Sequence, residues 1–227
     1  MGDTPGSGAA PPPRRRTVLA VMARYPTVGA VKTRLAATLG ESRACALYRA
    51  FLQDIEARFA AGPRQFVWVF HPPDSHFAAL APPRTRCVPQ VGENLGARLL
   101  HCVRQLCQEF DKVIVVGADM PHLRAAWIDE AEQGLDSADV VLGPTDDGGY
   151  YLIGLRAAHD LFSDIAMGTP RVCAETLAQA ARLNLRVHLL PRSFDIDTPA
   201  DLERLRGWLA AEGDADLPYT AAALRAG

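Results

Sequence analysis

Residues 112–121 read Lys-Val-Ile-Val-Val-Gly-Ala-Asp-Met-Pro, and the prediction of the fold begins with this stretch. An unbroken β-branched run is typical of a strand that is buried on both faces of a parallel sheet. The glycine allows close backbone approach and the proline ends the strand, which leaves Asp119 at its carboxyl end. Ligands of open α/β sheets bind along that edge. We interpret Asp119 as a ligand-binding acid; a helix cap or Asx turn before residues 123–133 is the alternative.

Strands and helices alternate along the rest of the chain. We expect strands at 17–23, 65–70, near Cys87, at 139–142, 150–155 and 186–190, and helices at 43–59, 95–110, near Trp127, at 170–183 and 199–211. This alternation predicts an α/β fold, a three-layer sandwich with a mainly parallel sheet. Shorter connections between the late strands leave room for an antiparallel edge.

The bulk numbers favour one domain. The chain has 227 residues, of which 48 % are hydrophobic and 22 % charged, which is enough for one sizeable core. We expect a disordered tail over 1–16, the domain over 17–212 and a C-terminal extension over 213–227.

Charge and cysteine content exclude several classes of protein. The formal net charge of −2 gives no basic surface for nucleic acid or an anionic membrane. No apolar run is long enough to span a membrane. The five cysteines form no Cys-x-x-Cys motif, which indicates reduced thiols in a cytoplasmic protein.

An acidic pair near the end of the chain is the second candidate site. In residues 194–202, Phe-Asp-Ile-Asp-Thr-Pro-Ala-Asp-Leu, the last five suit a helix start with a capping box. Asp195 and Asp197 are left over, and in an extended segment both point to the same side. Adjacent carboxylates attract a hard cation such as Mg²⁺, which often bridges to substrate phosphates. A solvated acidic turn is the alternative.

A basic motif follows the first predicted strand. Gly29 precedes Lys32 and Arg34 at a probable helix start, although neither a P-loop nor a dinucleotide fingerprint is present. A lysine point charge, an arginine fork and free helix N–H groups suit a phosphate chain. Two solvated basic residues on a helix face are an equal alternative.

Two further loops carry candidate residues. Asp146-Asp147-Gly148-Gly149 is a hairpin turn signal, and its glycines could also let a sugar lie against the backbone beside an aspartate. Either aspartate could serve as an acceptor base. The stretch 90–99 precedes a helix that Asn94 could cap, and Arg98 within it could bind a ligand or lie on the surface.

Five motifs together resemble a little-characterised bacterial family of the nucleotide-diphospho-sugar transferase superfamily. They are Lys-Thr-Arg-Leu at 32–35, Gly-Glu-Asn-Leu-Gly at 92–96, Gly-Ala-Asp-Met-Pro at 117–121, Gly-Pro-Thr-Asp-Asp-Gly-Gly-Tyr-Tyr at 143–151 and Asp-Ile-Asp-Thr-Pro at 195–199. Members are often labelled glycosyltransferases of arsenosugar biosynthesis or radical-SAM and selenium-associated transferases. The resemblance implies a Rossmann-like glycosyltransferase-A fold, with Mg²⁺ or Mn²⁺ held by Asp119 and by Asp195 or Asp197.

Three functions are compatible with these motifs. A glycosyltransferase would take a nucleotide sugar, with Gly148, Gly149 and Tyr150 near the sugar or its small-molecule acceptor. A nucleotidyltransferase would join a nucleoside triphosphate to a phosphorylated small molecule, which suits the single acid of Asp119-Met120-Pro121. A non-catalytic nucleotide-binding protein is disfavoured by the intact acids and glycines. We prefer glycosyl transfer and leave the oligomeric state open.

Overall fold

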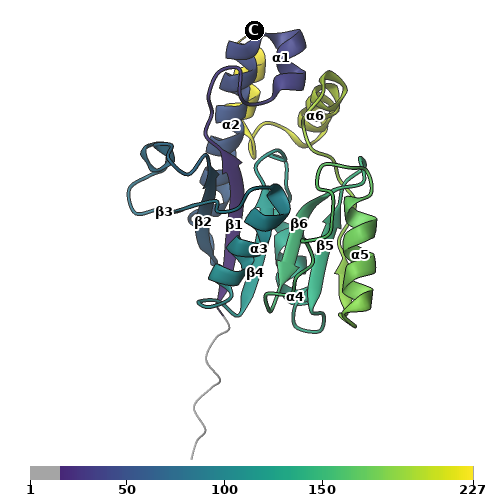
Figure 1. Cartoon of the computed structure of the whole chain (residues 1–227). Coiled ribbons are helices and arrows are strands. Elements are labelled where there is room, and N and C mark those ends of the chain that lie inside the picture. The colour runs from purple at the N-terminus through teal and green to yellow at the C-terminus, as the bar shows by residue number, and fades with distance from the viewer. Residues whose placement is uncertain (1–15, 227) are drawn as a thin grey trace, which may run out of the picture.

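A computed structural model describes residues 16–226. The tail expected over 1–16 lies outside the described residues, apart from Arg16. A seven-stranded sheet, in the order β3-β2-β1-β4-β6-β5-β7, is covered by helices on both faces (Figure 1). This arrangement confirms the predicted three-layer α/β fold with a mainly parallel sheet.

The elements follow the expected alternation. The strands are β1 (Thr17–Arg24), β2 (Gln65–His71), β3 (Arg86–Pro89), β4 (Lys112–Gly117), β5 (Val140–Pro144), β6 (Tyr150–Leu155) and β7 (Val187–Leu189). The helices are α1 (Thr33–Leu39), α2 (Glu41–Phe59), the 3₁₀ turn η1 (Phe77–Ala79), α3 (Leu95–Leu106), α4 (Ala125–Gly134), α5 (Val172–Arg182), α6 (Pro199–Glu212) and α7 (Pro218–Arg225).

The antiparallel strand is inside the sheet, so the expectation of an antiparallel edge was wrong. β6 pairs antiparallel with both β4 and β5, whereas β7 at the edge runs parallel to β5. Only residues 145–149 connect β5 to β6, and so short a loop can join neighbouring strands only as a hairpin. The longer connection through α5 then brings β7 back parallel to β5.

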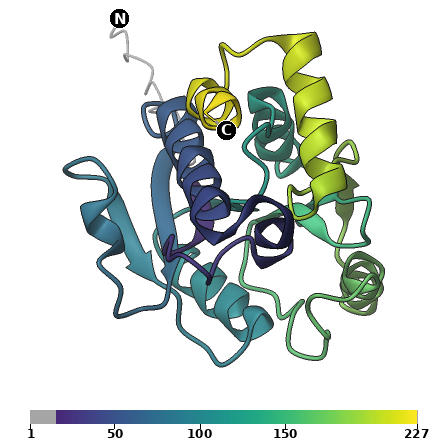
Figure 2. The same cartoon turned by 90° about the horizontal axis from the view of Figure 1, so that it is seen from above.

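Two apolar layers hold the helices to the sheet. Leu19, Val21 and Ala23 of β1 pack with α1, α2, α4, α6 and α7 on one face. Val18 and Ala20 alternate with them and pack with α3 on the other face, which α5 also covers. Figure 2 shows the same division from above, with the carboxyl ends of the parallel strands toward the viewer.

The segment expected only as an extension, 213–227, contains helix α7. This helix packs against α2, where the fully buried Asp54 accepts hydrogen bonds from the backbone amides of Tyr219 (3.0 Å) and Thr220 (2.7 Å). Burial raises the pKa of Asp54, while these hydrogen bonds act against the rise. Helix α7 is therefore anchored by a carboxylate of α2.

Two observations bear on the other expectations from the sequence. All five cysteines are free thiols. Among residues 16–226 no helix is long and apolar enough to cross a membrane.

Candidate active site

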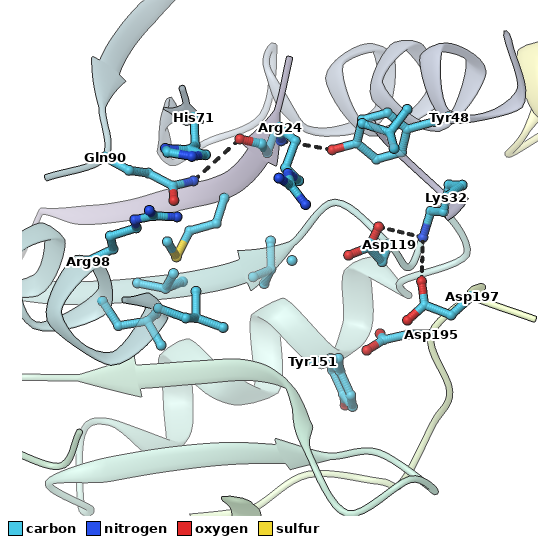
Figure 3. Close-up of a pocket in the computed structure, with 18 of the residues that line it drawn as sticks. Arg24, Lys32, Tyr48, His71, Gln90, Arg98, Asp119, Tyr151, Asp195 and Asp197 are labelled. Atoms are coloured by element: carbon cyan, nitrogen blue, oxygen red, sulfur yellow. Dashed lines mark hydrogen bonds and ion pairs between the residues drawn. The ribbon is translucent and has the colours of Figure 1, made fainter. Parts of the chain in front are cut away.

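A cleft of about 560 Å³ opens at the carboxyl ends of β1 and β4. Its walls come from β1, β2, β4, β6, the start of α1, the first turns of α3 and the segment 195–197 (Figure 3). Seven of the residues that the sequence singled out border this cleft: Lys32, Arg34, Arg98, Asp119, Tyr150, Asp195 and Asp197. The sheet edge named in the sequence analysis is therefore where they meet.

Backbone contacts fix the two acidic segments against each other. The amide of Ile196 donates to the carbonyl oxygen of Asp119 at 2.9 Å. Directly after it, the predicted capping box is present, since Thr198 accepts from the amide of Asp201 and Asp201 accepts from the amide of Thr198. The start of α6 thus holds the acidic segment rigidly beside the end of β4.

The side chain of Lys32 lies among the acids. Its ammonium nitrogen is 2.5 Å from Asp119 Oδ1, 3.0 Å from Asp197 Oδ1 and 2.7 Å from the carbonyl oxygen of Ile196 (Figure 3). An ammonium group has three N–H donors, so these three protein oxygens account for all of them. In this structure the cation between Asp119 and Asp197 is a lysine, and its expected contact with phosphate stays a prediction.

Burial and charge set the ionisation of Lys32. Its side chain is 2 % exposed and lies over the rings of Tyr48 and Phe51, at 5.8 and 5.7 Å. Burial alone would lower the pKa of Lys32, but Asp119 and Asp197 outweigh it, so the pKa is raised. The two carboxylates thus favour the charged form of Lys32 in the site.

Asp195 differs from its two neighbours because no described residue donates a hydrogen bond to its carboxylate. Burial, followed by repulsion from Asp119, raises the pKa of Asp195 to about 7, although Lys32 acts in the opposite direction. A further cation close to Asp195 would stabilise the charged form of its carboxyl group.

The donor set fits a divalent metal that a ligand completes. Among the described residues no group of three His, Cys, Asp or Glu side chains is placed to hold a metal alone. Asp119 and Asp195 nevertheless supply hard carboxylate oxygens at one end of the cleft. Mg²⁺ is commonly held by one or two carboxylates together with substrate phosphates. Asp119 and Asp195 are thus the residues that would bind it: Lys32 contacts one oxygen of Asp119 and one of Asp197, and Asp195 is the acid without a hydrogen-bond partner among the described residues.

Arg98 borders the opposite end of the cleft, and Arg24 lies between it and Asp119 (Figure 3). Arg98 Nε donates to the carbonyl oxygen of Gly92 at 2.9 Å, at the start of a helix that Asn94 caps as expected. Burial, followed by the charges of Arg98 and Arg24, lowers the pKa of His71, which also lines the cleft. Arg98, for which the sequence left a surface position open, lines the cleft.

Gln90 is a cleft residue that the sequence analysis did not identify. It is 7 % exposed, and its amide nitrogen donates to the carbonyl oxygens of Ala23 (3.3 Å) and Val69 (2.8 Å). The only signal in the sequence was a polar residue directly after a short strand. Its two bonds fix the side-chain amide in one orientation.

The Asp146-Asp147-Gly148-Gly149 loop forms the hairpin turn that the sequence predicted. Asp147 Oδ1 accepts from Thr145 Oγ1 (2.5 Å) and from the amide of Gly149 (3.1 Å), while Asp146 forms an ion pair of 2.7 Å with Arg204. None of these four residues lines the cleft, although Tyr150 does. Both aspartates have structural partners, and their role as an acceptor base stays a prediction.

Gly29 and Arg34, the other members of the basic motif, are exposed. Gly29 does not line the cleft and lies beside the carboxylate of Glu41. Arg34 lines it with a side chain that is 72 % exposed and 3.7 Å from Asp197 Oδ2. Of the motif, Arg34 is the member with a donor group open to a ligand.

The comparisons with known proteins agree with this fold. The fold is of the nucleotide-diphospho-sugar transferase type. Residues 55–169 match the family described as "Uncharacterized protein conserved in bacteria (DUF2064)", and the chain belongs to that family. No curated protein matches the chain.

Solved structures extend the match. A protein of Desulfovibrio desulfuricans G20, provisionally assigned as a nucleotide-diphospho-sugar transferase, is 31 % identical with a TM-score of 0.86, covering 92 % of this chain and 94 % of that one. The resemblance seen in the sequence is thereby confirmed.

More distant structures share the fold alone. CMP:2-keto-3-deoxy-manno-octonic acid synthetase complexed with CTP is 16 % identical with a TM-score of 0.52, covering 87 % of this chain and 99 % of that one. Rv0371C of Mycobacterium tuberculosis H37Rv, crystallised with manganese, is 17 % identical with a TM-score of 0.51, covering 84 % and 97 %.

Proposed function

We propose that the chain is a metal-dependent transferase that takes a nucleoside diphosphate sugar as donor. The observation that carries the proposal is the polarity of the cleft. One end has the carboxylates Asp119 and Asp195, Arg98 borders the other end, and the guanidinium group of Arg24 lies between them (Figure 3). A nucleotide diphosphate with its divalent ion has the complementary charges. The relative from Desulfovibrio, by its provisional assignment, supports the same donor.

In this proposal the chain mainly binds and orients. Arg24 attracts and aligns the donor's phosphates, and Asp119 and Asp195 place the metal beside them. A divalent ion bound there would neutralise the charge that develops on the departing diphosphate. The bond between the sugar carbon and the phosphate oxygen breaks, an acceptor oxygen bonds to that carbon, and its proton passes to a base. Asp146 or Asp147 is the candidate base, provided that the loop opens toward the cleft.

A second candidate is nucleotidyl transfer. The contacts of Asp146 and Asp147 favour this reaction. Both aspartates have partners in the 145–149 turn outside the cleft, and nucleotidyl transfer needs no base at that position. A phosphorylated acceptor would attack the α-phosphorus of a nucleoside triphosphate, and pyrophosphate would leave. Lys32 or Arg34 would then face the phosphates, as the sequence suggested.

Product analysis separates the two reactions. The full chain is incubated with Mn²⁺ and either a panel of nucleotide sugars or the four nucleoside triphosphates, and released nucleoside diphosphate and pyrophosphate are measured. Thermal shift selects the ligands first, since a ligand that binds the folded state raises its apparent stability. Diphosphate release that needs Mn²⁺ supports glycosyl transfer. Pyrophosphate release with inert nucleotide sugars would replace it by nucleotidyl transfer, and no binding of either class would refute both.

A further inference from the structure

The arginine end of the cleft contains a fixed hydrogen-bond acceptor. Gln90 uses both N–H groups of its amide on the carbonyl oxygens of Ala23 and Val69. Its own oxygen, Oε1, accepts from no described residue and points into the cleft on the side of Arg98 (Figure 3). Because reversing the amide would place Oε1 against two carbonyl oxygens, the hydrogen bonds assign the nitrogen to the side of Ala23 and Val69 and the oxygen to the cleft.

Arg98 supplies a donor fork beside this acceptor. Its Nε is used on the carbonyl oxygen of Gly92, which leaves the two terminal Nη groups without a protein acceptor among the described residues. Both residues border the same end of the cleft, away from the carboxylates. The pair therefore offers donor, donor and acceptor to a planar ligand that lies there.

This sequence of groups distinguishes the nucleobases. Guanine has acceptor, acceptor and donor in N7, O6 and N1–H, and cytosine has the same order in O2, N3 and N4–H. Adenine (N7, N6–H, N1) and uracil (O2, N3–H, O4) each place a donor between two acceptors. An arginine fork needs two adjacent acceptors, which only the first two bases provide.

We infer that Arg98 and Gln90 read the base of the donor nucleotide and select guanine or cytosine over adenine and uracil. The inference rests on the proposed function, because it needs the nucleotide phosphates at the carboxylate end and the base at the other. Arg98 is the specificity-determining residue, and Gln90 supplies the acceptor while it also ties β1 to β2.

Calorimetry with nucleoside diphosphates and Mn²⁺ tests the inference on the unaltered full chain. We expect GDP and CDP to bind at least about tenfold more tightly than ADP and UDP, the low end of what one bidentate contact gives. IDP keeps N7, O6 and N1–H and should match GDP. ADP is the control for IDP, because adenine presents N7, N6–H and N1 at the ring edge where hypoxanthine presents N7, O6 and N1–H. 7-Deaza-GDP and N1-methyl-GDP each lose one group and should fall toward ADP.

An arginine variant completes the test. Arg98→Lys keeps the positive charge but loses the fork, so it should abolish the preference among bases while affinity for the diphosphate is largely retained. Equal binding of all four diphosphates to the unaltered chain, or an unchanged preference in Arg98→Lys, would overturn the inference and leave the proposed function standing. Failure of every diphosphate to bind in the presence of Mn²⁺ would overturn both.

Discussion

The backbone amide of Ile196 donates a hydrogen bond to the carbonyl oxygen of Asp119 at 2.9 Å. This single contact joins the end of a central strand to the segment before α6. Asp195 and Asp197 flank Ile196 in the sequence, so this hydrogen bond holds both of them beside Asp119. The acid cluster is therefore fixed by main chain, and changes to its side chains should leave the fold intact.

Asp195→Asn should weaken Mn²⁺-dependent nucleotide binding at least about tenfold, because one of two carboxylate ligands is lost. Without metal the same variant should unfold at a higher temperature than the unaltered chain, since a carboxylate crowded by Asp119 and Asp197 is removed. Calorimetry and thermal unfolding measure the two effects. Asp129→Asn, at an exposed carboxylate paired with Arg64, is the control and should change neither. Unchanged metal-dependent affinity in Asp195→Asn would remove this residue from the metal site.

Lys32→Met should lower the free energy of unfolding by about 1.5–3 kcal/mol without metal, because Asp119 and Asp197 lose a charged hydrogen-bond donor while solvent screens the carboxylates that remain. Mn²⁺ should raise the midpoint of this variant more than that of the unaltered chain. Arg34→Met is the matched control, since its exposed contact with Asp197 contributes at most about 1 kcal/mol. If stability is unchanged in Lys32→Met and only nucleotide affinity falls, the ammonium serves the phosphates, as the sequence suggested.

Gly148→Ala should destabilise the protein by roughly 3 kcal/mol or more, because overpacking adds to the strain of a positive φ. A Cβ at this position would lie 1.9 Å from the carbonyl oxygen of Pro170. Gly168→Ala is the matched control, since its φ is also positive but the space around it is open, so about 1–2 kcal/mol is expected. Chemical denaturation compares them. Equal losses would mean that the loop shifts away from Pro170 at little cost.

His122→Phe should make stability less sensitive to acid. His122 is 2 % exposed between Phe194 and Trp208, and neither ring nitrogen has a hydrogen-bond partner among the described residues. Burial, followed by Arg58, Arg204 and Arg124, lowers its pKa to about 3.

The sign of that effect follows from proton binding. Between the unfolded pKa near 6.5 and the folded value, the unfolded chain binds the proton, so stability falls as the pH decreases. At pH 5 the variant should be more stable than the unaltered chain by roughly 2 kcal/mol beyond any difference at pH 7.5. Denaturation at both pH values, with the exposed His76→Gln as control, provides the measurement. A constant difference between variant and unaltered chain would show that His122 is already protonated or hydrated.

Much of the fold could be predicted because its signals are local. The buried run at 112–116, the helical spacing of 43–59 and the capping box at Thr198 each follow from adjacent residues, and each element is present. The position of β6 could not be predicted, because strand order depends on which edges remain open when the sheet assembles.

The sequence allowed us to predict which residues form the site, but not how they contact one another. Strand-end and extended-segment patterns placed Asp119, Asp195 and Asp197 along one edge, and the structure brings them together there. The contact of Lys32 with Asp119 and Asp197 could not be predicted, because it joins residues that are far apart in the sequence. A lysine after a strand is equally compatible with phosphates and with carboxylates. Gln90 was missed because one amide after a strand has no distinctive pattern.

The reversed strand β6 has a consequence for tolerance to insertion. Tyr150 and Tyr151 are its first residues, and they pack on opposite faces of the sheet, Tyr151 with the α2 layer and Tyr150 with the α3 layer. Both line the cleft at a register shift in the ladder with β5, since Gly143 pairs with Leu152 and Pro144 with Tyr150. Lengthening or shortening the preceding hairpin by one residue could slip the register and exchange the two rings. The number of residues in that turn is therefore under tighter constraint than their identity outside Gly148.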